Sequence, residues 1–245
     1  MKNIIRAAFL TTFALLLLGA NASGQSQTRE EVLREIETKR SELQKLEEQF
    51  LSPSAEDRSA YAEFLRQPDT GLIRLLPREV YESDTYKKNK KTITMRGGGA
   101  YYSFTRLTHE YGYGSHLGFD SGYLSVGFAG ADYGILTNLG DIPVEEISLE
   151  HPGVAFIAAY HVPQTEPQVR SEARRFSLGM TIDGVRYQNR FRVEANTSYV
   201  LRSINDSETD VLVAFRVVRK DKDGSVIIAW KLLKEFPVPK MVRAN

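Results

Sequence analysis

Cysteine is absent from all 245 residues of the sequence. The chain can therefore form no disulfide framework, cannot carry the lipid-modified cysteine of a bacterial lipoprotein and offers no thiol nucleophile. Its stability must come from a packed core, which a hydrophobic fraction of 42% and an aromatic fraction of 10% can supply. The length favours one main domain with an appendage over two full domains.

A strong charge of either sign is also lacking, because 32 Lys and Arg residues face 31 Asp and Glu residues. A chain this balanced has no overall electric field that would draw it to nucleic acid or to an anionic membrane. We therefore expect no nucleic-acid partner and no stable membrane anchor.

Common catalytic and cofactor signatures are missing as well. The sequence contains no Gly-x-Ser-x-Gly motif of a serine hydrolase. Its glycine run at 97–99 lacks the lysine and the helix that complete a phosphate-binding loop. We expect no cofactor.

The N-terminus carries the one long, mostly apolar run, from Ala7 to Ala20, preceded by Lys2 and Arg6. This run falls short of the roughly 20 residues that a helix needs to cross a bilayer. Small residues at positions 20 and 22 form a cleavage site before Ser23, which completes the pattern of a secretory signal peptide. The sequence thus predicts that residues 1–22 are removed and that the protein is exported, to a periplasm or to the extracellular space.

Residues 23–70 are expected to be helical and coiled-coil-like. Thr28 and Glu31 have the spacing of a capping box, and neither Gly nor Pro follows before residue 51. Apolar side chains recur at alternating intervals of four and three residues, except that Lys39 interrupts the series. A second, short helix is expected after Pro53, carrying Tyr61, Phe64 and Leu65.

The apolar seam of residues 28–51 spans only about three heptads, so it needs a partner surface. Two surfaces could supply it: the same helix of another copy, which would make a homo-oligomer, or a groove on the chain's own β-domain. We favour self-association of residues 28–51.

Residues 71–245 are expected to form an antiparallel β-sandwich or barrel-like domain, because the hydrophobic period changes to two. Clear alternation occurs at 211–217 and 226–232, with Asp223-Gly224 marking a hairpin between them. A further strand is expected at 185–193, with Arg186, Arg190 and Arg192 on its wet face. Other expected strands are 92–96, 100–107, 123–129, 147–150 and 154–160.

Glycines and tyrosines alternate with unusual density between residues 96 and 140. Loop tyrosines provide flat amphipathic surface of the kind that binds sugars or protein partners. We therefore expect Tyr101, Tyr102, Tyr111 and Tyr113 to form a ligand-binding surface for a protein or a carbohydrate. The alternative is that the glycines sit at turns while the tyrosines fill a sheet face.

The same segment contains His109, Glu110, His116 and Asp120. If they converged, these side chains could ligate a metal or act as an acid and base pair, as in a secreted carbohydrate-active or metal-assisted hydrolase. Their spacing matches no recognised metal motif, and as an alternative they are hydrogen-bonded loop residues.

The arginines at 186, 190 and 192 could grip carboxylates or phosphates, but interspersed acids make cross-strand pairing the expected outcome. Our leading hypothesis is a non-enzymatic, exported, soluble binding or assembly module, with the hydrolase as the alternative. No cofactor or metal is part of the leading hypothesis.

Overall fold

The computed structural model describes residues 28–81, 99–112, 114–128 and 132–242. The chain divides into two units, residues 1–46 and 47–245. The expected signal peptide, the expected strand at 92–96 and Tyr113 lie outside the described residues.

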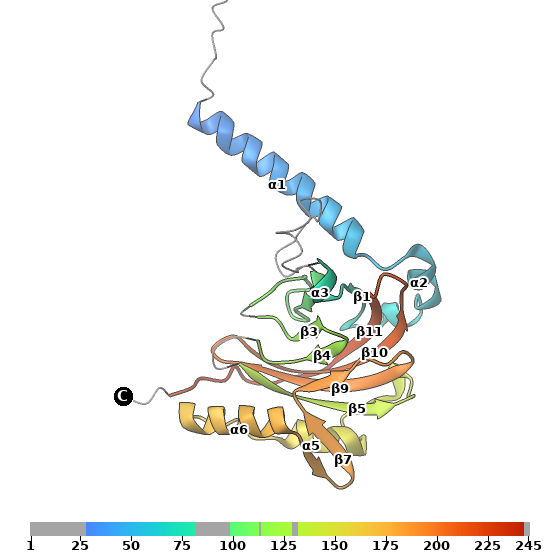
Figure 1. Ribbon diagram of the computed structural model, residues 1–245, viewed down its shortest axis with the longest axis vertical. Helices are drawn as coiled ribbons and strands as arrows, with labels where there is room; N and C mark the ends of the chain where they lie inside the picture. Colours follow the sequence, from blue (N-terminus) through green and yellow to red (C-terminus); the bar gives the residue numbers. More distant parts are fainter. Residues whose placement is uncertain (1–27, 82–98, 113, 129–131, 243–245) are drawn as a thin grey trace, which may run out of the picture. The chain divides into compact units, whose positions relative to one another are not determined.

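Helix α1 runs without interruption over Arg29–Leu51 (Figure 1). Its capping box is present, because the Thr28 amide donates to the Glu31 carboxylate at 2.8 Å and the Glu31 amide donates to Thr28 Oγ1 at 3.2 Å. Two amides that the first turn would leave without partners are thereby satisfied. The expected long N-terminal helix is confirmed.

The second helix, α2 (Ala55–Ala60), is also present, but it begins two residues later than Pro53 suggests. Ser54 caps it: the Asp57 amide donates to Ser54 Oγ at 3.1 Å, and the Ser54 amide donates to the Asp57 carboxylate at 3.1 Å. This reciprocal pair fixes the helix start. A 3-10 helix, η1 (Phe64–Arg66), follows and buries Phe64.

Most of the second unit is built around a seven-stranded sheet in the order β1-β11-β10-β9-β5-β7-β6, in which every neighbouring pair is antiparallel. The hairpin predicted between residues 217 and 226 is confirmed, because the Asp221 amide donates to the Ser225 carbonyl at 2.8 Å. Gly224 adopts a φ of +87° in this turn, a conformation that glycine reaches without a steric cost. The strands are β1 (Thr70–Leu75), β5 (Tyr133–Gly140), β6 (Met180–Ile182), β7 (Val185–Gln188), β9 (Thr197–Asn205), β10 (Thr209–Lys220) and β11 (Val226–Glu235).

A four-stranded antiparallel sheet in the order β2-β3-β4-β8 packs on one face of the large sheet (Figure 1). It consists of β2 (Tyr101–Tyr102), β3 (Leu117–Asp120), β4 (Tyr123–Ser125) and β8 (Arg190–Arg192). Buried side chains of both sheets form one core that includes Leu117, Phe119, Leu124, Val213, Phe215, Ile228 and Trp230. The expected fold class, a mainly β, antiparallel sandwich or barrel-like domain preceded by a long helix and a short one, is confirmed by these two antiparallel sheets.

Helices cover the opposite face of the large sheet, so that this sheet is a middle layer (Figure 1). These are α5 (Pro152–Ala159), α6 (Glu166–Leu178) and the 3-10 helix η3 (Val144–Glu146). Strand β10 shows the consequence, because Val213 packs toward the small sheet whereas its neighbour Leu212 packs toward the helices. A short helix, α3 (Arg78–Tyr81), follows β1.

Two expected strands are wrong. Residues 154–160 fall largely in helix α5, which begins where His151 Nδ1 accepts from the Gly153 amide at 3.1 Å and Pro152 occupies the first turn. Val154 and Ile157, three residues apart, both face the core, as expected for a helix. Apolar residues in this segment therefore fit the helical period as well as the alternation that suggested a strand. Residues 147–150 form no strand, and the expected strands at 100–107 and 123–129 shorten to β2 and β4.

The expected single strand at 185–193 is also wrong. Its two halves, β7 and β8, belong to different sheets. Asn189 is the crossing point, because its amide donates to the Phe176 carbonyl at 3.0 Å and its own carbonyl accepts from the Val126 amide at 3.0 Å. Arg186 therefore lies in the large sheet, whereas Arg190 and Arg192 lie in the small one.

Candidate functional site

The outward surface of the four-stranded sheet is the candidate site. Leu124 of β4 belongs to the core, and Phe191 of β8 packs against it. Because side chains alternate along a strand, their neighbours point away from the core. The outward residues pair across the two strands as Tyr123 with Arg192 and Ser125 with Arg190.

The other two strands complete this surface. Leu117, Phe119 and Tyr102 face the core, so Gly118, Asp120 and Tyr101 face outward. The pairing registers place the outward residues in two rows that cross the sheet. The rows are Tyr101, Gly118, Ser125 and Arg190, then Asp120, Tyr123 and Arg192; we call these residues, together with Tyr111 and Phe128 that pack on them, the outer face.

One end of the outer face is aromatic. The Tyr101 ring meets Tyr111 at a centroid distance of 4.7 Å and Phe128 at 5.1 Å, both edge to face. A Cβ atom on Gly118 would come within 2.8 Å of Phe128 and 2.9 Å of Tyr101, so a glycine is required where these rings cross the strand. Tyr101 is 5% exposed and is the base of the cluster, whereas Tyr111 is 41% exposed and presents its ring to solvent.

The other end of the outer face is cationic. The Arg190 guanidinium lies 3.9 Å from the centroid of the Tyr123 ring, a cation–π contact between strands β8 and β4. No carboxylate among the described residues forms an ion pair with Arg190 or Arg192, so the expected pairing with interspersed acids is not observed there. Both guanidinium groups remain able to bind an external carboxylate.

The backbone carbonyls of the two arginines each accept a hydrogen bond from another side chain. The hydroxyl of the buried Tyr199 donates to the Arg192 carbonyl at 3.0 Å, and Gln188 Nε2 donates to the Arg190 carbonyl at 2.5 Å. Asp120, two strands away on β3, pairs with Arg78 at 3.3 Å. The cationic end is thus presented by a fixed strand.

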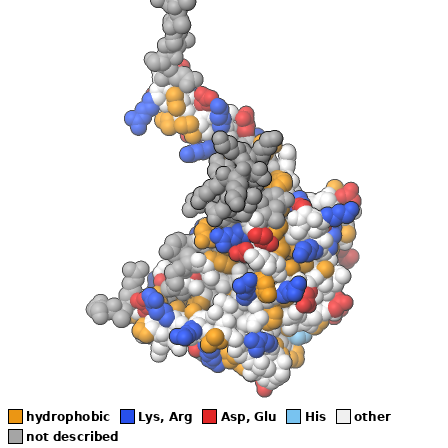
Figure 2. Space-filling model, viewed as in Figure 1, with side chains coloured by type: hydrophobic (Ala, Val, Ile, Leu, Met, Phe, Trp, Pro, Cys, Tyr) orange, Lys and Arg blue, Asp and Glu red, His pale blue; other side chains and the backbone are white. Residues whose placement is uncertain are grey.

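The surface charge of the second unit is mixed. Figure 2 shows Lys and Arg side chains spread over the second unit, with hydrophobic and acidic side chains between them. The full chain carries a formal net charge of only +1. Attraction of a charged ligand would therefore have to come from local groups.

Of the four tyrosines expected to bind ligand, Tyr101 and Tyr111 contribute to the outer face, and Tyr113 is not described. Tyr102 points into the core instead, where its ring lies 5.3 Å from Phe104 and 6.5 Å from Trp230. Burial raises the pKa of Tyr102 to about 12. Its position is that of a side chain that fills a sheet face.

The two histidines of the hydrolase alternative make structural hydrogen bonds. His116 Nδ1 accepts from the Phe104 amide at 2.9 Å, so Nε2 carries the proton and lies 2.8 Å from Thr209 Oγ1. Burial lowers the pKa of His116 to about 4. His109 Nε2 donates to the Arg74 carbonyl at 2.7 Å, and burial lowers the pKa of His109 as well.

The two acids of that alternative are paired with different arginines. Glu110 accepts from Arg106 at 3.0 Å, and Arg106 also pairs with Glu208 at 2.7 Å, whereas Asp120 pairs with Arg78. In the part of the chain that the structure describes, no group of three or more His, Asp and Glu side chains could hold a metal ion. Each of the four residues is thus engaged by other groups of the chain.

The sequence matches no protein-family model, and neither a curated protein nor a solved structure is significantly similar to it. Within the described residues, no helix has the length and apolar character needed to span a membrane. A functional hypothesis must therefore be based on the contacts of the outer face.

A groove of about 640 Å³ lies elsewhere, between residues 158–164 and residues 236–240. Its floor contains Arg202 and Asp210, which form an ion pair. Arg202 also donates to the carbonyls of Ile157 and Tyr160, and it lies 3.6 Å from the Phe236 ring centroid. Because these interactions occupy the Arg202 guanidinium and its partner Asp210, neither group on the floor of the groove is available to pair with a charged ligand.

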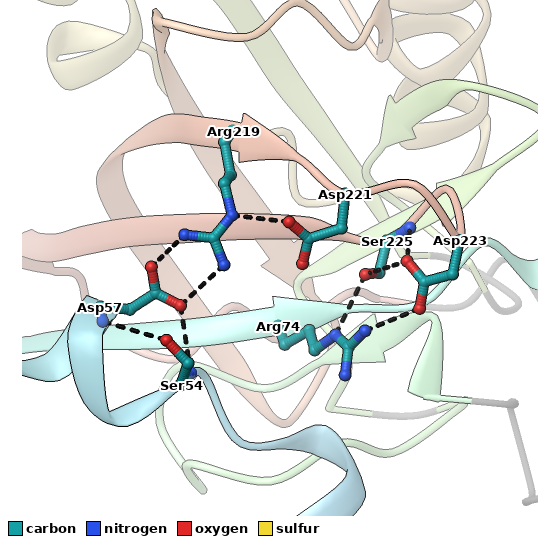
Figure 3. Close-up of polar contacts among 7 residues, drawn as sticks. All are labelled: Ser54, Asp57, Arg74, Arg219, Asp221, Asp223 and Ser225. Carbon is teal, nitrogen blue, oxygen red and sulfur yellow. Dashed lines mark hydrogen bonds and ion pairs between the residues drawn. The ribbon is translucent and has the colours of Figure 1, made fainter.

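A second polar cluster connects α2 and β1 to the β10–β11 hairpin (Figure 3). Arg219 binds the Asp57 carboxylate and donates to Asp221 at 2.6 Å. Arg74 donates to Asp223 at 2.6 Å and to Ser225 at 3.0 Å. The hydrogen bond from Arg219 lowers the pKa of Asp57, as expected for a structural ion pair.

Proposed function

We propose that this protein is an exported binding module that recognises an acidic peptide segment or protein surface through its outer face. The observation that carries the proposal is the stacking of Arg190 on Tyr123, beside Arg192, with no acid of the described chain paired to either arginine. Export rests on the signal-peptide pattern of residues 1–22.

The composition of the outer face favours a protein partner over a carbohydrate. Tyrosine, phenylalanine and arginine are the residues enriched in protein interfaces and in their energetic hot spots. Tyr111 and Tyr123 offer ring surface that loses little conformational entropy on binding, because a tyrosine has only two side-chain torsions. The stacking on Tyr123 orders Arg190 in advance.

The spacing of the arginines suggests how an acidic segment would bind. Arg190 and Arg192 are two residues apart on one strand, which separates their Cα atoms by about 7 Å. Alternate side chains of an extended peptide have the same spacing, so two acids in a Glu-x-Glu arrangement can meet the two guanidinium groups. Each guanidinium can form a bidentate pair with a carboxylate.

A fluorescent peptide of alternating Glu and Thr tests this proposal by anisotropy titration. We expect saturable binding, weakened at least about 10-fold by the double change Arg190→Ala with Arg192→Ala, and weakened by Tyr123→Ala. Arg170→Ala is the matched control, because Arg170 is exposed on α6, on the opposite side of the large sheet. A peptide of alternating Gln and Thr should not bind.

Two results would contradict the proposal. One is equal binding of the peptide to the double variant and to the Arg170→Ala control. The other is a clear preference for an acidic polysaccharide such as polygalacturonate over the peptide, which would make the partner a carbohydrate.

A further inference from the structure

Helix α1 carries a seam with alternating steps of four and three residues. Its six positions are Val32, Ile36, Lys39, Leu43, Leu46 and Phe50. Among the described residues of the first unit, 28–46, nothing covers the apolar members: Val32, Ile36, Leu43 and Leu46 are 38%, 40%, 51% and 62% exposed. Apart from Leu33 and the C-terminal Leu51, the remaining positions of α1 are polar or charged.

The width of this apolar stripe indicates whether the helix packs on a globular domain or on another helix. A helix that packs on a globular domain usually presents an apolar stripe at least about 100° wide, whereas the two-position seam is typical of a coiled coil. We propose that α1 forms a parallel, two-stranded coiled coil with a second copy of this chain, and that Lys39 sets its register.

The charges beside the seam favour the parallel orientation. With Ile36, Leu43 and Phe50 at heptad position a, Glu35 and Glu42 occupy position g, and Arg40 and Glu47 occupy position e. In a parallel pair, Glu35 faces Arg40 of the second copy, which is attractive, while Glu42 faces Glu47, which is repulsive.

An antiparallel pair with full overlap has no compensating attraction. Arg40 would then face Arg40, and Glu42 would face Glu42. Both flanks would thus hold like charges, without an attractive pair between ionised groups. The charge pattern is therefore better satisfied in the parallel orientation, by the two symmetric contacts between Glu35 and Arg40.

Lys39 occupies a position d in the middle of the seam. Its ammonium group binds Glu35 of the same helix at 2.7 Å, so the side chain bends out of the seam toward a flanking position. In the aligned parallel pair the two Lys39 side chains share one layer, and each can reach an acid. If one helix shifted by one heptad, each Lys39 would face Val32 or Leu46 of the other copy, and one layer of the seam would be lost. Lys39 therefore disfavours other registers, although it lowers the affinity of the dimer.

The helix has 23 residues, and three heptads are marginal for a stable coiled coil. The association is therefore weak and reversible. A dimer carries two outer faces, so it would bind a partner with repeated acidic segments more tightly than one copy could. The dimer itself does not depend on the proposed function and is tested separately.

Sedimentation of the purified chain tests association. We expect a monomer–dimer equilibrium whose dissociation constant rises at least about 10-fold with Leu43→Asp. Ser41→Asp is the matched control, since it adds the same charge two residues away at position f, opposite the seam. Lys39→Leu should tighten association and release the restriction to dimers. Fluorescence of the single tryptophan, Trp230, reports whether each variant keeps its β-domain folded.

Orientation is tested with single cysteines, because the chain contains none of its own. In the aligned parallel pair Leu46→Cys lies opposite itself and should form an intermolecular disulfide under mild oxidation. In the antiparallel pair position 46 lies opposite position 36, so the disulfide would need Ile36→Cys on the other copy. Cross-linking only in that mixture would overturn the parallel arrangement.

Other outcomes would overturn the dimer itself. A monomeric wild-type chain in which Leu43→Asp lowers the melting temperature would show that α1 packs on its own β-domain. A monomeric chain whose stability does not respond to Leu43→Asp would show that the seam serves some other partner.

Discussion

Arg202 and Asp210 form a bidentate ion pair inside the second unit, with Nε to Oδ1 and Nη2 to Oδ2 both at 2.7 Å. Their side chains are only 3% and 1% exposed. The pair connects β9 to β10, and the remaining guanidinium contacts extend it to α5 and to Phe236, after β11. One buried arginine thereby links four segments.

Removal of one partner should be costly. Asp210→Ala leaves a buried guanidinium without its counter-charge, which lowers the free energy of unfolding by about 3–5 kcal/mol. Urea unfolding followed by Trp230 fluorescence measures this loss. The control is Glu166→Gln, which breaks the exposed pair with Arg170 and should change stability by less than about 0.5 kcal/mol. Similar losses in the two variants would contradict the interior role of the Arg202–Asp210 pair.

His116 should make stability fall in mild acid. Its pKa is about 4 in the folded chain, against an ordinary value of 6.5, because burial disfavours the charged ring. The unfolded chain therefore takes up a proton as pH falls below 6.5, while the folded chain does not until about pH 4. The histidine's contribution is complete above pH 6.5 and decreases by up to roughly 3 kcal/mol on the way to pH 4.

A variant isolates the part of the profile that His116 causes. In His116→Gln the amide can still accept from the Phe104 amide and donate to Thr209, but it does not titrate. Urea unfolding at pH 7 and pH 5 should show a smaller decrease for the variant than for the wild-type chain. Equal decreases would mean that His116 does not cause the loss of stability between pH 7 and pH 5.

Asp132 should have the opposite effect. Burial, followed by repulsion from Asp206 and Glu208, raises the pKa of Asp132 to about 6, above its ordinary value of 3.8. The folded chain therefore holds a proton that the unfolded chain has lost between these values, and stability falls as pH rises through them. Its side chain is only about half buried, so the solvent-discounted penalty at pH 7 is about 1 kcal/mol.

Asp132→Asn should remove that penalty. The amide oxygen can still accept from the Asp206 amide, which lies 3.2 Å from Asp132 Oδ1. We expect the variant to be more stable than the wild-type chain at pH 7 by about 1 kcal/mol and equally stable near pH 3.5. A variant less stable at pH 7 would show that the carboxylate makes a stabilising contact.

We expect residues 1–22 to be removed as a signal peptide, which predicts a defined N-terminus. The small residues at 20 and 22 predict that the exported chain begins at Ser23. Intact-mass measurement of the exported protein should therefore show the loss of residues 1–22. Exported protein that retains Lys2 and Arg6 would contradict this prediction.

Local signals in the sequence predicted the local structure. The capping box of Thr28 and Glu31 depends on side chains three residues apart, and the hairpin at Asp223-Gly224 depends on one turn. Strands β5 and β9 were not predicted, because they lie in the middle layer and much of each is buried on both faces, which leaves no polar alternation to detect. Helix α5 was misassigned for a related reason, since its short apolar run fits either period.

The candidate site was only partly predictable. Tyr101 and Tyr111 could be identified as candidate aromatic residues, but the contact of Tyr123 with Arg190 joins strands far apart in the sequence. The crossing at Asn189 separates Arg186 from Arg190 and Arg192, and no local pattern marks it. The interior position of Arg202 likewise depends on Asp210, which meets it only after β9 and β10 pair.

Site-specific photo-cross-linking from the outer face tests the central proposal most directly. Ser125 lies in the middle of that face, between Gly118 and Arg190, whereas Ser171 is an exposed serine on α6. A photoreactive residue at position 125, in the cells that produce the protein, should yield a discrete adduct with an acidic protein. The same residue at position 171 should yield none, and Arg190→Ala with Arg192→Ala should abolish the adduct. An adduct from position 171 alone, an adduct at 125 that persists without both arginines, or no adduct at 125 would contradict the outer face as the recognition surface.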